Sequence, residues 1–214
     1  VRGGWVVEQG GGTGVLKARR PGKLGGKMAF TGIENGPFAA RRARKLYPNQ
    51  GIRCEDFTRA QLWHGYDLAI GNPPFSNRTV HGRDGLEKQG LSLHDFFIAR
   101  SLEALRPGGI ALFVTSRYTL DKTDPKARQI IGESADLLGA VRLPEGAMRD
   151  DAGTDVVVDI LAFRKREVGE VPSNESWVET ADIPDSDEGN GPLVINRYFL
   201  DHPEQVLGCH IWTT

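Results

Sequence analysis

The chain contains few cysteines and no long apolar stretch, and these two features exclude several classes of protein. Cys54 and Cys209 are its two cysteines, too few for a disulfide framework and without the spacing of metal ligands. No apolar run approaches the length of a membrane span, and the first residues show no signal-peptide pattern. We therefore expect a reduced, cytoplasmic, globular protein with no membrane partner and no bound metal.

Net charge is also nearly absent, although the two ends of the chain differ strongly in sign. The formal net charge is −1, which taken alone argues against a nucleic-acid binder. Residues 1–50 carry ten Lys/Arg against two acids, whereas residues 167–204 carry ten Asp/Glu against one arginine. A basic face can therefore still attract phosphate groups. For residues 41–45 alone, a solvated helix face is the better interpretation.

Short apolar segments alternate with helical patterns along most of the chain. Strands are expected at residues 5–7, 28–33, 52–54, 66–71, 110–115, 138–143 and 156–163, with the fifth buried throughout its length. Strands that alternate with helices predict an α/β fold with a doubly wound, seven-stranded, mostly parallel sheet. The last two strands lack an obvious helix between them, so we expect antiparallel pairing at one edge of the sheet.

Two helices are expected from apolar residues at helical spacing. The first spans residues 37–47 with a stripe at Phe38, Ala39, Ala43 and Leu46, and the second spans residues 92–105 with a stripe at Leu93, Phe97, Ile98, Leu102 and Leu105. The sequence Pro-Gly-Gly at residues 107–109 is expected to stop the second helix. His94 and Asp95, at its start, are interpreted as capping and packing residues rather than catalysts.

The first candidate binding segment is VVEQGGGTG, from Val6 to Gly14. A strand that runs into closely spaced glycines lets a ligand approach the backbone, although such turns also serve tight packing alone. The segment lacks the Lys-Ser/Thr of a phosphate-binding loop, which disfavours a nucleoside triphosphate. Glu34 follows at the end of the next strand, about 20 residues on, where an acid accepts hydrogen bonds from ribose hydroxyls. By itself, Glu34 is equally well explained as a helix cap.

Two further segments follow strands that end at the same edge of the predicted sheet. Asp56 and Phe57 come after the third strand and suit an exocyclic amine and a purine ring, while Asp56 is equally well read as a turn residue. The stretch NPPF, Asn72 to Phe75, comes after the fourth strand. Pro73 and Pro74 stiffen the backbone, so the Asn72 side-chain carbonyl and the Pro73 carbonyl form two fixed acceptors beside an aromatic ring. This arrangement predicts a receptor for a planar group that bears an amine.

The ordered set VVEQGGGTG, FTGIE, CEDF, IGNPPF and PGGIALFVTS resembles the S-adenosylmethionine-dependent DNA adenine-N6 methyltransferases. The resemblance covers roughly Trp5 to Arg164 and includes the signature Asn/Asp/Ser-Pro-Pro-aromatic. It implies a Rossmann-like methyltransferase domain at residues 1–166, in a bacterial or phage context such as restriction-modification. The segments GLSLHDFFIARSLEALRPGG and INRYFLDHPEQVLG also resemble methylase modules joined to, or encoded beside, helicase-like proteins.

The resemblance implies a role for each matching position. Glu8, Gly10, Gly12 and Gly14 would border the methionine part of S-adenosylmethionine, Glu34 would hold its ribose, and Asp56, Phe57 and Asn72 would complete its site. Asn72 and the Pro73 carbonyl would bind the target amine of a flipped-out adenine in DNA, with Pro74 stiffening the segment and Phe75 stacking on the base. The loop 76–89 carries Arg78, His81, Arg83 and Lys88, which suits either contact with DNA phosphates or a solvated loop.

One departure from the family leaves alternatives open. Gln9 stands where proline is usual, and Gly10-Gly11 where alanine or serine is common, which is expected to loosen the loop and weaken cofactor binding. A catalytically degenerate module that binds DNA or a partner is therefore an alternative, as is methylation of RNA or of a protein glutamine amide. Residues 167–214 are expected to form an acidic, loosely structured extension. We expect the chain to be a piece of a longer protein, with the target sequence read by a fused or associated helicase-like or target-recognition subunit.

Overall fold

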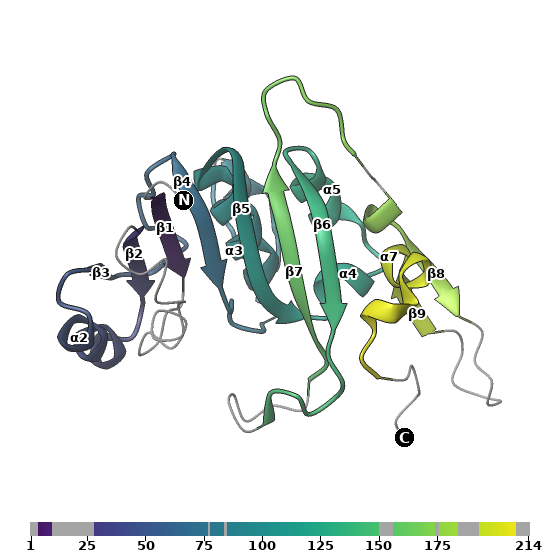
Figure 1. Ribbon diagram of the computed structural model, residues 1–214, viewed down its shortest axis with the longest axis horizontal. Helices are drawn as coiled ribbons and strands as arrows, with labels where there is room; N and C mark the ends of the chain where they lie inside the picture. The colour runs from purple at the N-terminus through teal and green to yellow at the C-terminus, as the bar shows by residue number, and fades with distance from the viewer. Residues whose placement is uncertain are drawn as a thin grey trace.

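The chain folds around one seven-stranded sheet (Figure 1). The computed structural model describes residues 4–9, 28–76, 78–83, 85–149, 156–173, 176–183 and 193–208. The strands of this sheet are β1 (Gly4–Gln9), β2 (Met28–Glu34), β3 (Gly51–Cys54), β4 (Tyr66–Gly71), β5 (Leu105–Ser116), β6 (Ala135–Arg142) and β7 (Val158–Lys165). The connecting helices are α2 (Pro37–Leu46), η1 (Gly85–Gln89), α3 (Leu93–Ala104), α4 (Tyr118–Asp121) and α5 (Lys126–Gly132).

The strand order is β3-β2-β1-β4-β5-β7-β6. Neighbours from β3 to β5 pair in parallel, and β7 pairs antiparallel with both β5 and β6. The predicted mostly parallel sheet with antiparallel pairing at one edge is therefore confirmed, and β7 is the reversed strand beside the edge strand β6. The chain runs from β1 outward to β3 and then crosses to β4, so the switch point of the topology lies between β1 and β4.

The helices α3, α4 and α5 lie behind the sheet in Figure 1. On β5, Ala111, Phe113 and Thr115 are buried, whereas Leu112 is 42% exposed. The expectation that residues 110–115 form a continuously buried strand is therefore wrong. Alternate side chains of a strand point to opposite faces, and within the described residues the helices α3–α5 cover this half of the sheet on one face.

The helix α3 is more deeply buried than its predicted apolar stripe implies. Ten of its twelve residues are buried, because it packs against β5, α5 and η1. It ends at Ala104, and β5 begins at the next residue, so Pro107–Gly109 do not stop the helix but lie inside the strand. Gly108 has a φ of +72°, which glycine adopts without strain, and the β4–β5 register shifts between Tyr66 and Leu68.

The helix α2 buries only part of its predicted apolar stripe. Ala40 and Ala43 pack with Ile52 of β3, whereas Phe38 is 77% exposed and Leu46 is also exposed. Ala43 was part of the predicted stripe, whereas Ala40 was not, and these two small residues allow the helix to approach the short strand closely.

The extension after residue 166 contains ordered elements, which differs from the loosely structured surface expected there. These are η2 (Ser176–Val178), β8 (Thr180–Ile183), β9 (Leu193–Asn196), α7 (Arg197–Asp201) and η3 (Pro203–Gln205), with β8 and β9 paired antiparallel. Trp177 is fully buried, and its ring lies 5.7 Å from that of Phe163 in β7. The expectation rested on the acidic, proline-bearing composition and gave no weight to such apolar anchors. A domain boundary at residue 166 stays a prediction.

Candidate functional site

The carboxyl ends of four parallel strands form one edge of the sheet. The register aligns Gln9 at the end of β1 with Ile33 of β2 and with Gly71 of β4, and aligns Glu34 with Cys54 of β3. Residues as far apart in the sequence as Gln9 and Gly71 are thereby brought to the switch point, where ligands of doubly wound sheets bind.

A cavity of about 330 Å³ opens at this edge. Its lining comes from the ends of β2, β3 and β4 and from the start of α3, and consists of Ile33, Glu34, Asn35, Glu55, Asp56, Phe57, Asn72, Pro74, Arg78, Leu93 and Phe97. Five residues predicted from the sequence, Glu34, Asp56, Phe57, Asn72 and Pro74, thus face one cavity. Their separate roles stay predictions.

The two predicted acids in the cavity each combine a local structural contact with their place in its wall. Glu34 accepts a hydrogen bond from the Gly36 backbone N–H at 2.7 Å, at the start of α2. Asp56 accepts from the backbone N–H and the hydroxyl of Thr58, both at 2.8 Å. The cap and turn interpretations left open by the sequence are therefore correct, and both residues also line the cavity.

The apolar wall of the cavity includes two phenylalanines in contact. Phe57 is buried, and its ring centroid lies 4.6 Å from that of Phe97 in α3. Leu93, the first residue of α3, extends the same wall. A flat apolar ligand group would find packing on this wall, in a cavity that Glu34 and Asp56 also line.

The NPPF segment alternates between exposed and buried positions. Asn72 and Pro74 are exposed and line the cavity, Pro73 is buried, and Phe75 is half-buried. Pro73 and Phe75 are not part of the cavity lining. The segment thus presents the Asn72 side chain to the cavity, while Phe75 lies outside it.

Other predicted cofactor residues lie apart from the cavity lining or outside the described residues. Glu8 is fully buried in β1 and does not line the cavity. Gly10, Gly12 and Gly14 lie outside the described residues, so their proposed contacts with the methionine part stay predictions.

Gln9 takes a position that the sequence does not reveal. Its side chain is fully buried and lies against Gly71, where a Cβ would come within 2.7 Å of the Gln9 Cδ. Within the described part of the chain, neither polar atom of its amide has a hydrogen-bond partner. A side chain at position 71 would therefore require the Gln9 side chain to move.

Arg78 is a cavity residue for which the sequence favoured neither of two surface roles. The Leu93 N–H donates to the Arg78 carbonyl at 2.8 Å, and the Val80 N–H donates to the Leu91 carbonyl at 2.9 Å. These bonds tie the loop after NPPF to the start of α3 and place Arg78 in the cavity wall. The contacts are made by backbone groups, so side-chain patterns carry no signal of them.

A second polar cluster lies at the same edge of the sheet, where β6 ends and β7 begins. Arg142 donates to Asp159 at 2.8 and 2.9 Å and contacts Asp121 at 2.8 and 3.0 Å, and all three residues are buried. Burial alone would lower the pKa of Arg142, but its bonds to Asp159 and Asp121 raise that pKa above its usual value. The three charged side chains of this closed cluster thus pair with one another.

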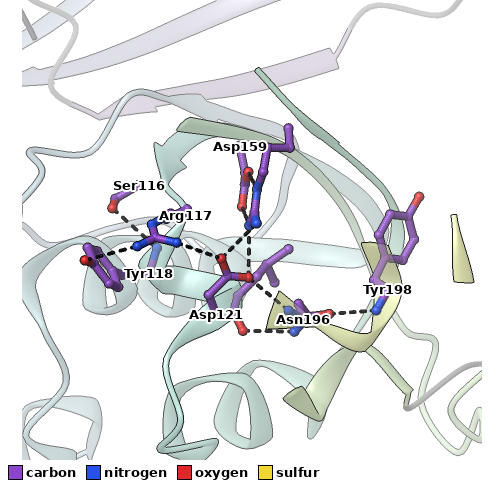
Figure 2. Close-up of polar contacts among 9 residues, drawn as sticks. Ser116, Arg117, Tyr118, Asp121, Asp159, Asn196 and Tyr198 are labelled. Carbon is purple, nitrogen blue, oxygen red and sulfur yellow. Dashed lines mark hydrogen bonds and ion pairs between the residues drawn. The ribbon is translucent and has the colours of Figure 1, made fainter. Parts of the chain in front are cut away.

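The closed cluster also fastens the extension to the sheet (Figure 2). The Asn196 backbone N–H donates to Asp121 at 2.9 Å, and its side-chain amide donates to the carbonyls of Leu120 and Trp177 at 2.9 and 2.8 Å. Arg142 also lies over the ring of Phe199, 4.2 Å from its centroid. This second cluster therefore has a structural role.

A membrane-spanning helix and a three-ligand metal site each have requirements that the described residues do not meet. No helix among them is long and apolar enough to cross a membrane. Within the same ranges, no three His, Cys, Asp or Glu side chains gather closely enough to hold a metal ion.

The fold, unlike the sequence, has clear relatives. No protein-family model and no curated protein matches the chain. A structure described as a class I S-adenosylmethionine-dependent methyltransferase from Listeria monocytogenes matches with a TM-score of 0.64 and 18% identity, covering 82% of this chain and 57% of that one. A structure described as the modification subunit of a type I restriction enzyme from Vibrio vulnificus matches with a TM-score of 0.57 and 19% identity, covering 89% and 44%.

A third structure is that of the N-methyltransferase NodS from Bradyrhizobium japonicum in complex with S-adenosyl-L-homocysteine, with a TM-score of 0.53 and 16% identity, covering 78% of this chain and 80% of that one. This chain thus spans little more than half of the Listeria structure and less than half of the Vibrio one. At such identities the likeness establishes the fold. The chain has the Rossmann-like fold of S-adenosylmethionine-dependent methyltransferases.

Proposed function

We propose that the chain transfers a methyl group from S-adenosylmethionine to the N6 amine of an adenine flipped out of DNA. The observation that carries the proposal is the single cavity to which Glu34, Asp56 and Asn72 contribute from the carboxyl ends of β2, β3 and β4, at one edge of the sheet. The similarity of the fold to a restriction-enzyme modification subunit supports DNA as the substrate.

The residues around the cavity suit the adenosine part of the cofactor. Ribose hydroxyls and an exocyclic amine are donors, and Glu34 and Asp56 are acceptors, while Phe57, Leu93 and Phe97 provide the apolar wall that a purine ring needs. Glu34 would hold the ribose and Asp56 the adenine amine. When bound, S-adenosylmethionine supplies a methyl group activated by the sulfonium.

The NPPF segment would activate the acceptor amine. An exocyclic aryl amine is a weak nucleophile because its lone pair is delocalised into the ring. Hydrogen bonds from its two protons to the Asn72 side-chain carbonyl and the Pro73 carbonyl favour a more tetrahedral nitrogen with a localised lone pair. Both bonds strengthen as positive charge develops on the nitrogen, which stabilises the transition state.

Substrate access requires the base to leave the duplex, because its N6 atom cannot enter a pocket while it is stacked and paired. Phe75, half-buried beside the cavity, would replace part of the lost stacking. Reading of the target sequence is assigned in this proposal to a helicase-like or target-recognition subunit, fused to the chain or associated with it.

The test is methyl transfer from labelled S-adenosylmethionine to unmethylated DNA, RNA and protein in parallel, with Asn72→Ala as the control. We expect label in DNA and its loss in Asn72→Ala. Label in RNA or in protein glutamine instead would show that the substrate is not DNA, while methyl transfer to a planar nitrogen would still hold. Absence of transfer to all three, with no cofactor binding by a folded chain, would identify a degenerate module.

A further inference from the structure

A buried polar group lies directly behind the NPPF segment, at the start of α3. His94 is 2% exposed and Asp95 is 1% exposed, and the cap residue Ser92 is buried beside them. Burying ionisable side chains costs free energy unless hydrogen bonds offset it. The contacts of His94 and Asp95 therefore show which interactions offset the cost of burying them.

The first contact reaches the residue directly after the NPPF segment. His94 Nδ1 lies 3.2 Å from the backbone carbonyl oxygen of Ser76, the residue that follows Phe75. Because a carbonyl oxygen only accepts, Nδ1 carries the proton and donates it. The imidazole thus binds the backbone at the exit of the segment.

The second set of contacts surrounds the imidazole and the Asp95 carboxylate. His94 Nε2 lies 3.5 Å from Asp95 Oδ1, and Asp95 accepts a hydrogen bond from the Ser92 hydroxyl at 2.6 Å. Lys122 from α4 lies 3.8 Å from the same carboxylate. The Ser92 hydroxyl also lies 3.3 Å from His94 Nε2. Asp95 is buried at the start of α3, which confirms its expected packing role, whereas the cap residue Ser92 makes no side-chain capping hydrogen bond.

The loop is also held just beyond this point. The Arg78 backbone N–H donates to the Ser76 hydroxyl at 3.1 Å, and the Arg78 carbonyl accepts from the Leu93 N–H at 2.8 Å. The rigid prolines precede Phe75, and the His94 contact follows it. Phe75 is consequently held between two fixed backbone points.

We propose that His94 is a positioning residue that fixes the Ser76 carbonyl relative to the cofactor cavity. Through this contact it also positions the Phe75 ring and the two acceptors, the carbonyls of the Asn72 side chain and of Pro73. This inference rests on the proposed function, since it assigns the contact to alignment of the flipped base. Misplacement of a reacting group by about 1 Å can cost about 100-fold in rate. His94 does not line the cavity, so cofactor binding is independent of it.

The test compares His94→Ala, His94→Asn and Ser101→Ala. Asparagine can place an amide N–H near the position of Nδ1, so it restores the donor. Ser101 is the matched control, because its hydroxyl makes another buried hydrogen bond of α3, to the Phe97 carbonyl at 2.7 Å, and it lies about two helical turns beyond His94. Each variant is assayed for S-adenosylmethionine affinity, for single-turnover methyl transfer to unmethylated genomic DNA, and for hydrogen exchange in the peptide 75–80.

We expect His94→Ala to transfer methyl groups about 10- to 100-fold more slowly, with cofactor affinity within about twofold of the wild type and faster exchange in the peptide 75–80. His94→Asn should recover most of both losses, and Ser101→Ala should match the wild type. Wild-type rate and exchange in His94→Ala would overturn the positioning role alone, as would an equal rate loss in Ser101→Ala. A folded wild type that shows no transfer would instead overturn the proposed function, while exchange still reports whether His94 holds the loop.

Discussion

Two polar regions at the same edge of the sheet use their charges differently. Around Arg142, buried charges pair with one another and leave no acceptor open to solvent. Around Asn72, the acids Glu34 and Asp56 make one or two local hydrogen bonds and still face a cavity. Charge at a sheet edge therefore indicates a ligand site only where the fold leaves it facing a cavity, and the predictions below test that distinction.

The largest effect is expected from breaking the closed cluster. Arg142→Ala would leave Asp121 and Asp159 buried without their cation, which costs about 3–5 kcal/mol of the free energy of unfolding. The exposed pair Arg106–Asp67, at the opposite edge, has a similar N–O distance of 2.7 Å, and Arg106→Ala should cost about 1 kcal/mol or less. Urea unfolding measures both, and equal losses would contradict the assignment of the Arg142 cluster to stability.

The next effect concerns the open region. Glu34→Ala should weaken S-adenosylmethionine binding by about 10- to 100-fold, because ribose hydroxyls would lose a charged acceptor. Asp67→Ala removes a carboxylate from the opposite edge of the sheet and should leave the affinity unchanged. Isothermal titration calorimetry of both variants decides the matter. An unchanged affinity in Glu34→Ala would show that Glu34 has a structural role and does not bind the ribose.

A smaller effect is expected at Gln9, at the end of β1 between β2 and β4. Its buried amide has no hydrogen-bond partner within the described residues, and methionine has a similar shape. Gln9→Met should therefore raise the free energy of unfolding by about 1–2 kcal/mol. Thermal and urea unfolding would reveal it, and a loss of stability would mean that the amide has a partner worth more than its burial.

The smallest effect is a pH dependence of stability from Asp136 in β6, which forms a buried ion pair with Arg166. Burial alone would raise the pKa of Asp136, but hydrogen bonds from Arg166 and Ser173 hold that pKa below its ordinary value. A lowered pKa in the folded state adds stability above the unfolded pKa, and this stability is lost as the pH falls through the folded one. As the pH falls below about 4, the free energy of unfolding of the wild type should decrease more steeply than that of Asp136→Asn. Parallel slopes in urea titrations at several pH values would refute this.

The composition of the cavity was largely predictable because it follows from topology. Once strands were assigned before Glu34, Asp56 and Asn72, the parallel order brought their carboxyl ends to one edge. Arg78 was not assigned to the cavity, because backbone hydrogen bonds to the residues before α3 place it there.

Other parts of the structure depend on contacts that a pattern search does not weigh. The burial of Gln9 depends on the missing side chain of Gly71, a strand away. The order of the extension depends on Trp177 and Asn196, whose partners Phe163 and Asp121 lie in other elements. Acidic composition dominated the prediction there, whereas a few buried anchors decide the fold.

The most direct test of the central claim is nucleoside analysis of unmethylated DNA after incubation with S-adenosylmethionine and the chain. Wild type and Asn72→Ala are compared by mass spectrometry of the digested DNA. The account predicts N6-methyldeoxyadenosine with the wild type and a loss of at least about 100-fold with Asn72→Ala. Undiminished methylation by Asn72→Ala, or a methyl group on a ring carbon instead of an amine, would contradict it.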